Sequence, residues 1–227
     1  VGPGGIGKTR LAWAAAREAS PRFADGVAWV DLSALDDGAR VAATVARALD
    51  IAAPERGAPD ASAAVAAVLR ARHLMLLLDN CEHVLDAVGT LVEALQRLAP
   101  RVHVLATSQE PLRVAREQVI RLQTLPDAAA VQLFVARATA ADRRFSADAP
   151  AQALAGAICQ RLGGIPLAIE LAASRCRSLR PQQIRVGLAV SFDLLTGGVR
   201  AALPRQQTLE ASIAWSHGLL GPPARLL

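Results

Sequence analysis

The sequence lacks the features that mark membrane-spanning, secreted and zinc-binding proteins. Its apolar runs, such as Leu74–Leu78, are far shorter than the roughly 20 residues that cross a bilayer. Nothing at its start resembles a signal peptide. Its three cysteines, Cys81, Cys159 and Cys176, are widely spaced without a CxxC pair, which argues against a disulfide framework and a zinc site. We therefore expect a cytoplasmic protein with no membrane partner.

Lysine and aromatic residues are also scarce. Tyrosine is absent, aromatic residues make up 3% of the chain, and Lys8 is the only lysine. The net charge of +5 comes from arginines that are scattered among acidic residues, and no stretch forms a basic block. Clustered basic residues are the usual footprint of a nucleic-acid-binding surface, so we expect no nucleic-acid binding by this segment itself.

The single lysine lies in a glycine-rich motif at the start of the sequence. Residues 2–9 read GPGGIGKT, which matches the phosphate-loop pattern GxxxxGK[ST]. Glycines let successive backbone amides point at phosphate oxygens, and the helix that follows adds its positive end. Lys8 is long enough to reach the β and γ phosphates, and the Thr9 hydroxyl is suited to coordinate Mg²⁺. The predicted nucleotide-binding residues of this motif are Gly2, Pro3, Gly4, Gly5, Ile6, Gly7, Lys8, Thr9 and Arg10.

Short apolar segments alternate with helical patterns over the first half of the sequence. The unbroken apolar run at 74–78 is typical of a strand buried on both faces. Strands that alternate with helices of this length predict βαβ units and a doubly wound parallel sheet, an α/β architecture of the P-loop NTPase kind. The expected elements are strands at 26–32, 74–78, 101–107 and 118–122, and helices at 8–19, 39–49, 61–71 and 84–98.

Only helices are expected after Pro126, and a chain of 227 residues is long enough for a second small domain. These helices are predicted at 128–139, 150–162, 166–177 and 181–190, before a break at 195–198 and a last helix at 209–215. We expect a nucleotide-binding domain at 1–123, a helical domain at 124–190 and the incomplete beginning of a third domain at 191–227. The strand that leads into a phosphate loop would precede residue 1, so we expect the sequence to be a fragment.

Asp79 ends the apolar strand at 74–78, where the sheet topology would place it beside the phosphate loop. This arrangement fits a Walker B strand, with Asp79 and Thr9 as the magnesium site. Asn80 occupies the next position, where many such ATPases carry a carboxylate, and an amide cannot act as a base. Glu82 is the nearest alternative carboxylate. Two interpretations of Glu82 stay open, a catalytic base that polarises water and a charge at a helix N-terminus.

Thr107 and Ser108 end the next strand, where a hydroxyl would lie near the γ-phosphate and sense its presence. Capping of the following turn explains these two residues equally well. Farther along, the segment 163–173 reads GGIPLAIELAA and places Pro166 in the first turn of a helix.

Five motifs, GPGGIGKTRLA, LLLDNCEHV, VLATSQEPL, GGIPLAIELAA and finally LTGG with PRQQTLEASIAWS, follow one another in the sequence. In this order the chain resembles the nucleotide-binding module of STAND-class ATPases, close to the NB-ARC type, as found in bacterial LuxR-like and SARP-like transcriptional regulators. The resemblance implies that Pro166 packs against the nucleotide and that a winged-helix domain begins near residue 192. Gln109 stands where such proteins often have an arginine, which argues against γ-phosphate sensing by this segment.

The resemblance also implies a switch, closed over ADP and rearranged when ATP replaces it, with formation of a homo-oligomer in the ATP state. DNA is then a partner only through domains outside this sequence. From these observations the first hypothesis is a regulatory ATP/ADP switch of signal transduction with weak Mg²⁺-dependent ATPase activity at most. The alternatives are an efficient hydrolase or motor ATPase that uses Glu82 as its base, and an interaction scaffold that is indifferent to nucleotide.

Overall fold

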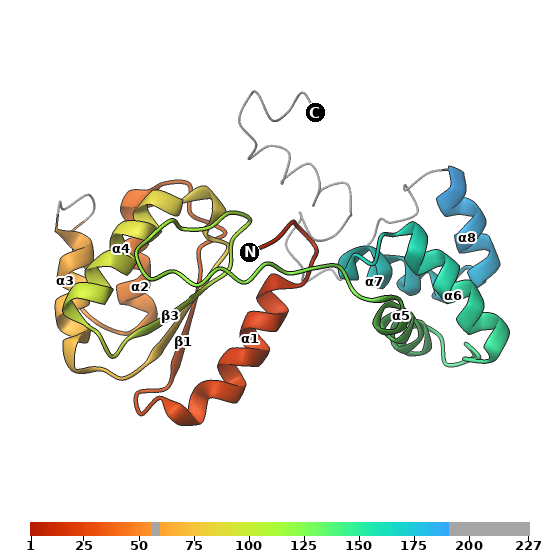
Figure 1. Cartoon of the computed structure of the whole chain (residues 1–227), viewed down its shortest axis with the longest axis horizontal. Coiled ribbons are helices and arrows are strands. Elements are labelled where there is room, and N and C mark those ends of the chain that lie inside the picture. Colours follow the sequence, from red (N-terminus) through yellow and green to blue (C-terminus); the bar gives the residue numbers. More distant parts are fainter. Residues whose placement is uncertain (56–59, 191–227) are drawn as a thin grey trace. The chain divides into compact units, whose positions relative to one another are not determined.

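A computed structural model describes residues 1–55 and 60–190, which form two compact units (Figure 1). Of the described residues, the sheet unit comprises Val1–Gly2 and 8–121, and the helical unit comprises Pro3–Gly7 and 122–190. The predictions for 191–227, including the break at 195–198 and the helix at 209–215, lie outside the described residues. The domain limits at 123 and 190 remain predictions.

The sheet unit is built on three parallel strands, as the alternating pattern predicts. The strands β1 (Val27–Asp31), β2 (Met75–Asp79) and β3 (His103–Ala106) lie in the order β1-β2-β3. In the register of the sheet, Asp31 is opposite Asp79 and Leu78 is opposite Ala106. The α/β fold class with a parallel sheet is therefore confirmed. Because the strands are parallel, their carboxyl ends all lie at the same edge of the sheet.

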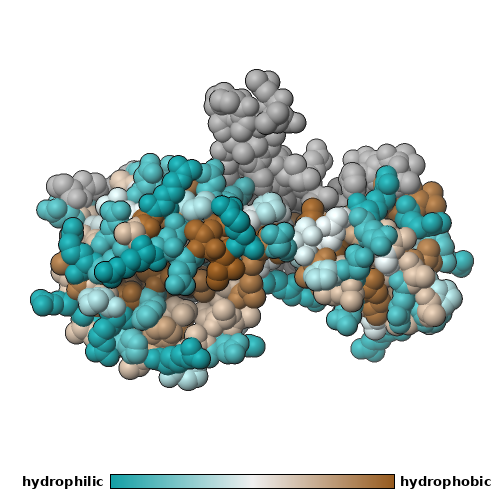
Figure 2. Space-filling model, in the orientation of Figure 1, coloured by the Kyte–Doolittle hydropathy of each residue, from teal (hydrophilic) through white to brown (hydrophobic). Residues whose placement is uncertain are grey.

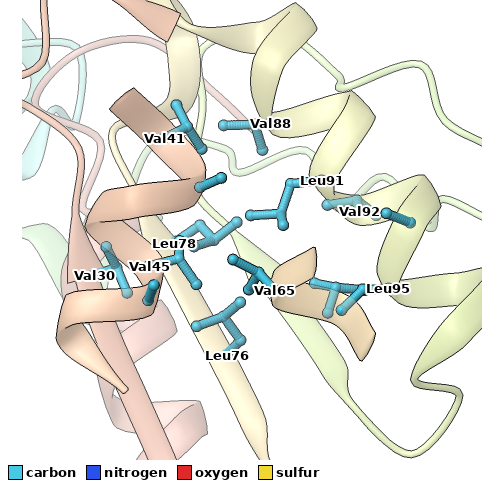
Figure 3. Close-up of a cluster of buried hydrophobic side chains, with 14 of the residues drawn as sticks. Val30, Val41, Val45, Val65, Leu76, Leu78, Val88, Leu91, Val92 and Leu95 are labelled. Carbon is cyan, nitrogen blue, oxygen red and sulfur yellow. The ribbon is translucent and has the colours of Figure 1, made fainter. Parts of the chain in front are cut away.

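Side chains alternate along each strand, so apolar residues point to both faces of the sheet. Helices cover both faces and bury these residues. Leu77 packs on one face against Ala12 and Ala16 of α1. Leu76 and Leu78 point to the other face, into the main core (Figure 3). The helices of this unit are α1 (Lys8–Ala19), α2 (Val41–Ala48), α3 (Ala61–Val68) and α4 (Leu85–Leu98), with short 3₁₀ turns η1 (Ser20–Arg22), η2 (Gly38–Arg40), η3 (Leu69–Ala71) and η4 (Cys81–His83).

The expected strand at 118–122 is wrong, because this segment has no regular secondary structure. A strand needs a ladder of backbone hydrogen bonds with a neighbour. Instead of a ladder, the amino group of Val1 donates a hydrogen bond to the carbonyl oxygen of Ile120 at 2.6 Å. The apolar pattern of the segment alone does not show whether another strand lies beside it.

The helical unit has its own core around Phe134, Ile158 and Ile169. Its elements are α5 (Asp127–Ala141), α6 (Ala149–Arg161), α7 (Pro166–Ser174), η5 (Arg175–Arg177) and α8 (Pro181–Val190). The Asp148 carboxylate caps α6 by accepting a hydrogen bond from the amide of Ala151 at 2.9 Å. All four predicted helices of this part are therefore present.

The surface of each unit mixes hydrophilic and hydrophobic side chains (Figure 2). Trp13 of α1 and Trp29 of β1 are about half exposed, at 49% and 50%. Among the described residues, no helix is long and apolar enough to cross a membrane.

Candidate nucleotide-binding site

The phosphate loop leads directly into α1, which begins at Lys8. Gly5 and Gly7 have φ angles of +76° and +96°, a region that side chains other than hydrogen rarely permit. Lys8 Nζ donates a hydrogen bond to the carbonyl oxygen of Gly2 at 2.7 Å, so the lysine folds back along the loop. The first amides of α1 have no carbonyl partner within the helix, which is the usual reason that such a helix start attracts phosphate.

In the sheet unit, three polar side chains form one row at the carboxyl ends of the strands. This polar row consists of Asp31 at the end of β1, Asp79 at the end of β2 and Thr107 after β3. Asp79 lies two residues after Leu77 and therefore on the same face, the face that α1 covers. Asp79 Oδ1 accepts hydrogen bonds from Thr9 Oγ1 at 2.8 Å and from Thr107 Oγ1 at 2.5 Å. Asp31 continues the row on the other side of Asp79. The structure thus brings together Thr9, Asp79 and Thr107, which the sequence separates by up to 98 positions.

Asp79 is 2% exposed, and its surroundings fit a hard divalent cation. Burial raises the pKa of the Asp79 carboxyl above its ordinary value, whereas the hydroxyl hydrogen bonds from Thr107 and Thr9 lower it. Burial of a carboxylate is unfavourable unless a counter-charge or hydrogen bonds compensate. Oxygen ligands such as Thr9 Oγ1 and the Asp79 carboxylate suit Mg²⁺, which usually takes only one or two protein ligands besides water and phosphate.

Asn80 has a role that the sequence did not reveal. Its backbone is in the left-handed region, at φ 63° and ψ 53°, which asparagine tolerates better than most residues. Its amide Nδ2 donates to Asp79 Oδ2 and to Asp31 Oδ1, both at 3.1 Å. Its backbone N–H donates to Thr107 Oγ1 at 3.0 Å. Asn80 is therefore tied to all three members of the polar row.

Glu82 lies in η4 and is one of the residues that line a cavity of about 580 Å³. The cavity is lined by η2 and by the start of α4, with Asp37, His83 and Asp86 among its lining residues. Glu82 Oε2 is buried and has no hydrogen-bond partner among the described residues. The lining does not include Lys8 or Thr9. The catalytic role of Glu82 stays a prediction.

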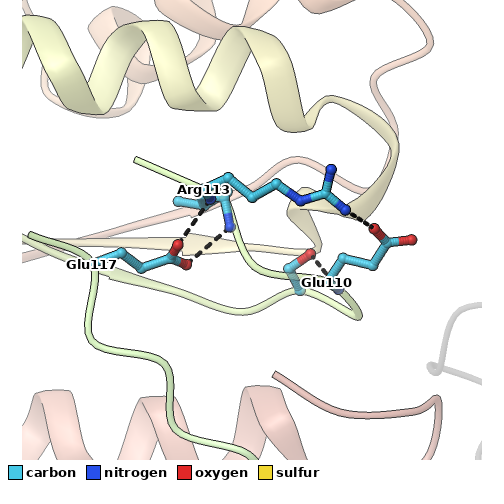
Figure 4. Close-up of polar contacts among 5 residues, drawn as sticks. Glu110, Arg113 and Glu117 are labelled. Atoms are coloured by element: carbon cyan, nitrogen blue, oxygen red, sulfur yellow. Dashed lines mark hydrogen bonds and ion pairs between the residues drawn. The ribbon is translucent and has the colours of Figure 1, made fainter. Parts of the chain in front are cut away.

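Ser108 and the loop after it are held by side chains of that loop (Figure 4). Ser108 is 2% exposed, and its Oγ accepts the amide of Glu110 at 3.3 Å, which is the turn-capping arrangement. The Glu117 carboxylate accepts the amides of Leu112 and Arg113 at 2.9 and 2.8 Å. Arg113 Nη2 pairs with Glu110 Oε2 at 3.3 Å. Sensing of the γ-phosphate by Thr107 and Ser108 remains a prediction.

Within the helical unit, the phosphate loop contacts the start of α7. The backbone N–H of Leu167 donates to the carbonyl oxygen of Gly5 at 3.1 Å. A Cβ atom at Gly5 would lie 3.0 Å from Leu167 Cβ and 3.6 Å from Ile165 Cγ2. Pro166 is the first residue of α7. Sequence reasoning chose Pro166 and missed its two neighbours, although the GGIPL motif contains all three.

A phosphate loop, a helix start behind it and a buried strand-end aspartate bonded to the loop threonine define a P-loop nucleotide-binding module on a parallel α/β sheet. The family model of the NB-ARC domain matches residues 1–143. The chain belongs to the NB-ARC family, a family of nucleotide-binding domains.

Relatives of known name are bacterial regulators. A Mycobacterium tuberculosis protein named as an HTH-type transcriptional regulator is 43% identical over 227 residues, covering 100% of this chain and 25% of the relative. An uncharacterised protein of the same species is 37% identical over 228 residues, covering 58% of its length. The regulatory protein AfsR of Streptomyces griseus is 32% identical over 237 residues, covering 98% of this chain and 22% of AfsR. The chain thus spans about a quarter of the length of the mycobacterial regulator.

Proposed function

We propose that this chain is the ATP/ADP-binding switch module of a cytoplasmic, signal-transducing transcriptional regulator, with slow Mg²⁺-dependent hydrolysis at most. The observation that carries the proposal is the hydrogen bond between Thr9 of the phosphate loop and the buried Asp79. It joins the loop that would hold phosphates to the carboxylate that would hold the cation. The similarity to named regulators supports the regulatory part.

In the proposed complex, different residues of the chain bind the phosphates, the Mg²⁺ ion and the rest of the nucleotide. The amides of the loop and the first turn of α1 would hold the phosphates, and Lys8 would contribute its positive charge to them. Thr9 and Asp79 would hold Mg²⁺, which neutralises phosphate charge when bound. Pro166, at the first turn of α7, would pack against the nucleotide, and Thr107 with Ser108 would face its γ-phosphate.

Slow turnover is supported by the chemistry of position 80. The Asn80 amide donates both of its observed hydrogen bonds to carboxylates and cannot accept a proton from water. We therefore place this module among switches, in which the bound nucleotide selects a conformation. Homo-oligomerisation in the ATP state, a helical domain at 124–190, a winged-helix domain from 191 and DNA binding through other domains complete the proposal.

Titration of fluorescent ADP and ATP against the purified protein tests the proposal. We expect saturable binding that Lys8→Ala weakens by about 100-fold or more, because a desolvated charge partner of phosphate is worth about 3 to 5 kcal/mol. Arg97→Ala is the matched control. Arg97 lies in the last turn of α4, just before β3 begins, and therefore at the opposite edge of the sheet from the loop. Absence of saturable binding, or equal losses in both variants, would contradict the proposal.

A further inference from the structure

The polar row contains a second carboxylate that the nucleotide-binding function does not yet use. Asp31 ends β1 and lies in register with Asp79, on the neighbouring strand. Its side chain is fixed by Ser33, whose backbone N–H and hydroxyl donate to Oδ1 and Oδ2, each at 2.9 Å. A carboxylate held in this way has a defined orientation toward the row.

Two neighbouring carboxylates repel each other, and a hydrogen-bond donor between them offsets part of this repulsion. Asn80 provides this donor, because one amide nitrogen bonds to an oxygen of each carboxylate at 3.1 Å. The asparagine is itself fixed by its backbone bond to Thr107 and is only 9% exposed. Since Thr107 and Thr9 occupy Oδ1 of Asp79, the Asn80 bond to Oδ2 leaves Asp79 with both oxygens oriented.

We propose that Asn80 is a positioning residue of the cation site, which orients Asp79 and holds the charge of Asp31 beside it. This inference rests on the proposed function, because it concerns the Mg²⁺ that accompanies the nucleotide. The Asn80 bridge keeps the charge of Asp31 beside Asp79, the carboxylate that bonds to the Thr9 hydroxyl, and a second nearby charge increases the attraction for a divalent cation. Outer partners of metal ligands commonly change metal affinity by about 10- to 100-fold when they are removed.

The same contacts explain why position 80 has an asparagine and not a carboxylate. An aspartate there would put a third negative charge beside two others and would have no N–H to donate to them. The amide is therefore required for the geometry of the row, whatever the rate of hydrolysis. Asn80 acts through Asp79 and Asp31 and is not a catalytic residue.

The test measures Mg²⁺ dependence of binding and needs no turnover. Fluorescent ADP is titrated in EDTA and at a series of Mg²⁺ concentrations, with the whole chain as wild type, Asn80→Gly and Asp31→Asn. Glycine keeps the left-handed backbone, and asparagine keeps an acceptor oxygen for Ser33 while removing the charge. Asp50→Gly is the matched control, because Asp50 is also left-handed, at φ 53°, but is exposed and outside the row.

We expect both row variants to raise the Mg²⁺ concentration at half effect by about 10-fold, while ADP affinity in EDTA stays within about twofold of wild type. Unchanged Mg²⁺ dependence in both variants would overturn the inference, and so would equal losses with and without Mg²⁺, which indicate a general disruption. A wild-type protein that binds ADP without any Mg²⁺ effect overturns the inference and leaves nucleotide binding intact. A wild-type protein that binds no nucleotide overturns the proposed function itself.

Discussion

Replacement of Thr107 by valine would remove one hydroxyl from the centre of the polar row and keep the shape of the side chain. Thr107 is 4% exposed. Its Oγ1 donates to Asp79 at 2.5 Å and accepts the backbone N–H of Asn80 at 3.0 Å. The Thr107→Val variant therefore loses a hydrogen bond to a buried carboxylate and leaves a buried N–H without its partner.

Both losses have known magnitudes. A hydrogen bond to a charged group contributes about 1.5 to 3 kcal/mol, and an unsatisfied buried donor costs about 1 to 3 kcal/mol. The two losses share one hydroxyl and relaxation recovers part of them, so we expect Thr107→Val to lower the free energy of unfolding by about 2 to 4 kcal/mol. Thr107→Ser keeps the hydroxyl and removes one methyl group, which costs about 1 kcal/mol.

The effect should also depend on pH in a defined direction. Burial already raises the pKa of Asp79, and the Thr107 hydroxyl opposes this rise. A carboxyl with a raised folded-state pKa favours folding below its unfolded value, near 3.8, and this contribution is lost as pH rises through the folded value. Without Thr107 the folded pKa rises further. The penalty of Thr107→Val should therefore be largest at neutral pH and should shrink as the pH falls toward 4.

Urea unfolding followed by tryptophan fluorescence measures these differences, because Trp13 and Trp29 of the sheet unit contribute to the signal together with Trp215. Far-UV circular dichroism on the same samples checks that the probes agree, as a two-state treatment requires. Thr107→Val and Thr107→Ser are compared at pH 7 and at pH 5. A valine penalty no greater than the serine penalty at pH 7 would refute the reasoning, because the hydroxyl would then contribute nothing to the row.

Three further results follow from the geometry. Gly5→Ala should lower stability by about 1 kcal/mol or more beyond Gly7→Ala in thermal unfolding, since both have positive φ but only Gly5 lies against the start of α7; equal losses would show that this contact is unimportant. Glu82→Gln decides between the two interpretations of Glu82, because loss of a true base should lower ATP turnover by about 10²- to 10⁴-fold, whereas a charge at a helix N-terminus should leave turnover within about twofold. Burial raises the pKa of the Cys159 and Cys176 thiols to about 11, so thiol reagents at pH 8 should label them about 100-fold more slowly than after unfolding, and fast labelling of the folded chain would contradict their burial.

The parts of the fold that depend on neighbours in sequence could be predicted. The glycine loop and α1 follow from a contiguous motif, and α1 begins and ends at the predicted residues. The apolar run at 74–78 contains its own evidence for a buried strand, and the strand is found at Met75–Asp79. In contrast, the segment at 118–122 has strand-like composition, yet a strand exists only where another backbone lies beside it.

The same distinction separates the predicted and missed residues of the site. Asp79 could be chosen because it ends an obvious strand. Asp31 ends a weaker one, and its importance depends on a register with a residue 48 positions away, which no local pattern shows. The expected strand at 26–32 did run through an aspartate, in the sequence VDL, and comparison with the LDN of the next strand was the available signal.

The role of Asn80 depends on the residues that it contacts. From the sequence, Asn80 indicated only the loss of a base, whereas the structure gives it two carboxylates to bridge. The requirement for an amide at position 80 then depends on the residue at position 31, because a neutral substitute for Asp31 removes the like charge that Asn80 separates from Asp79. In an Asp31→Ser background, Asn80→Asp should therefore be tolerated better than in the wild type. The two positions form one unit of the site, and neither is interpretable without the other.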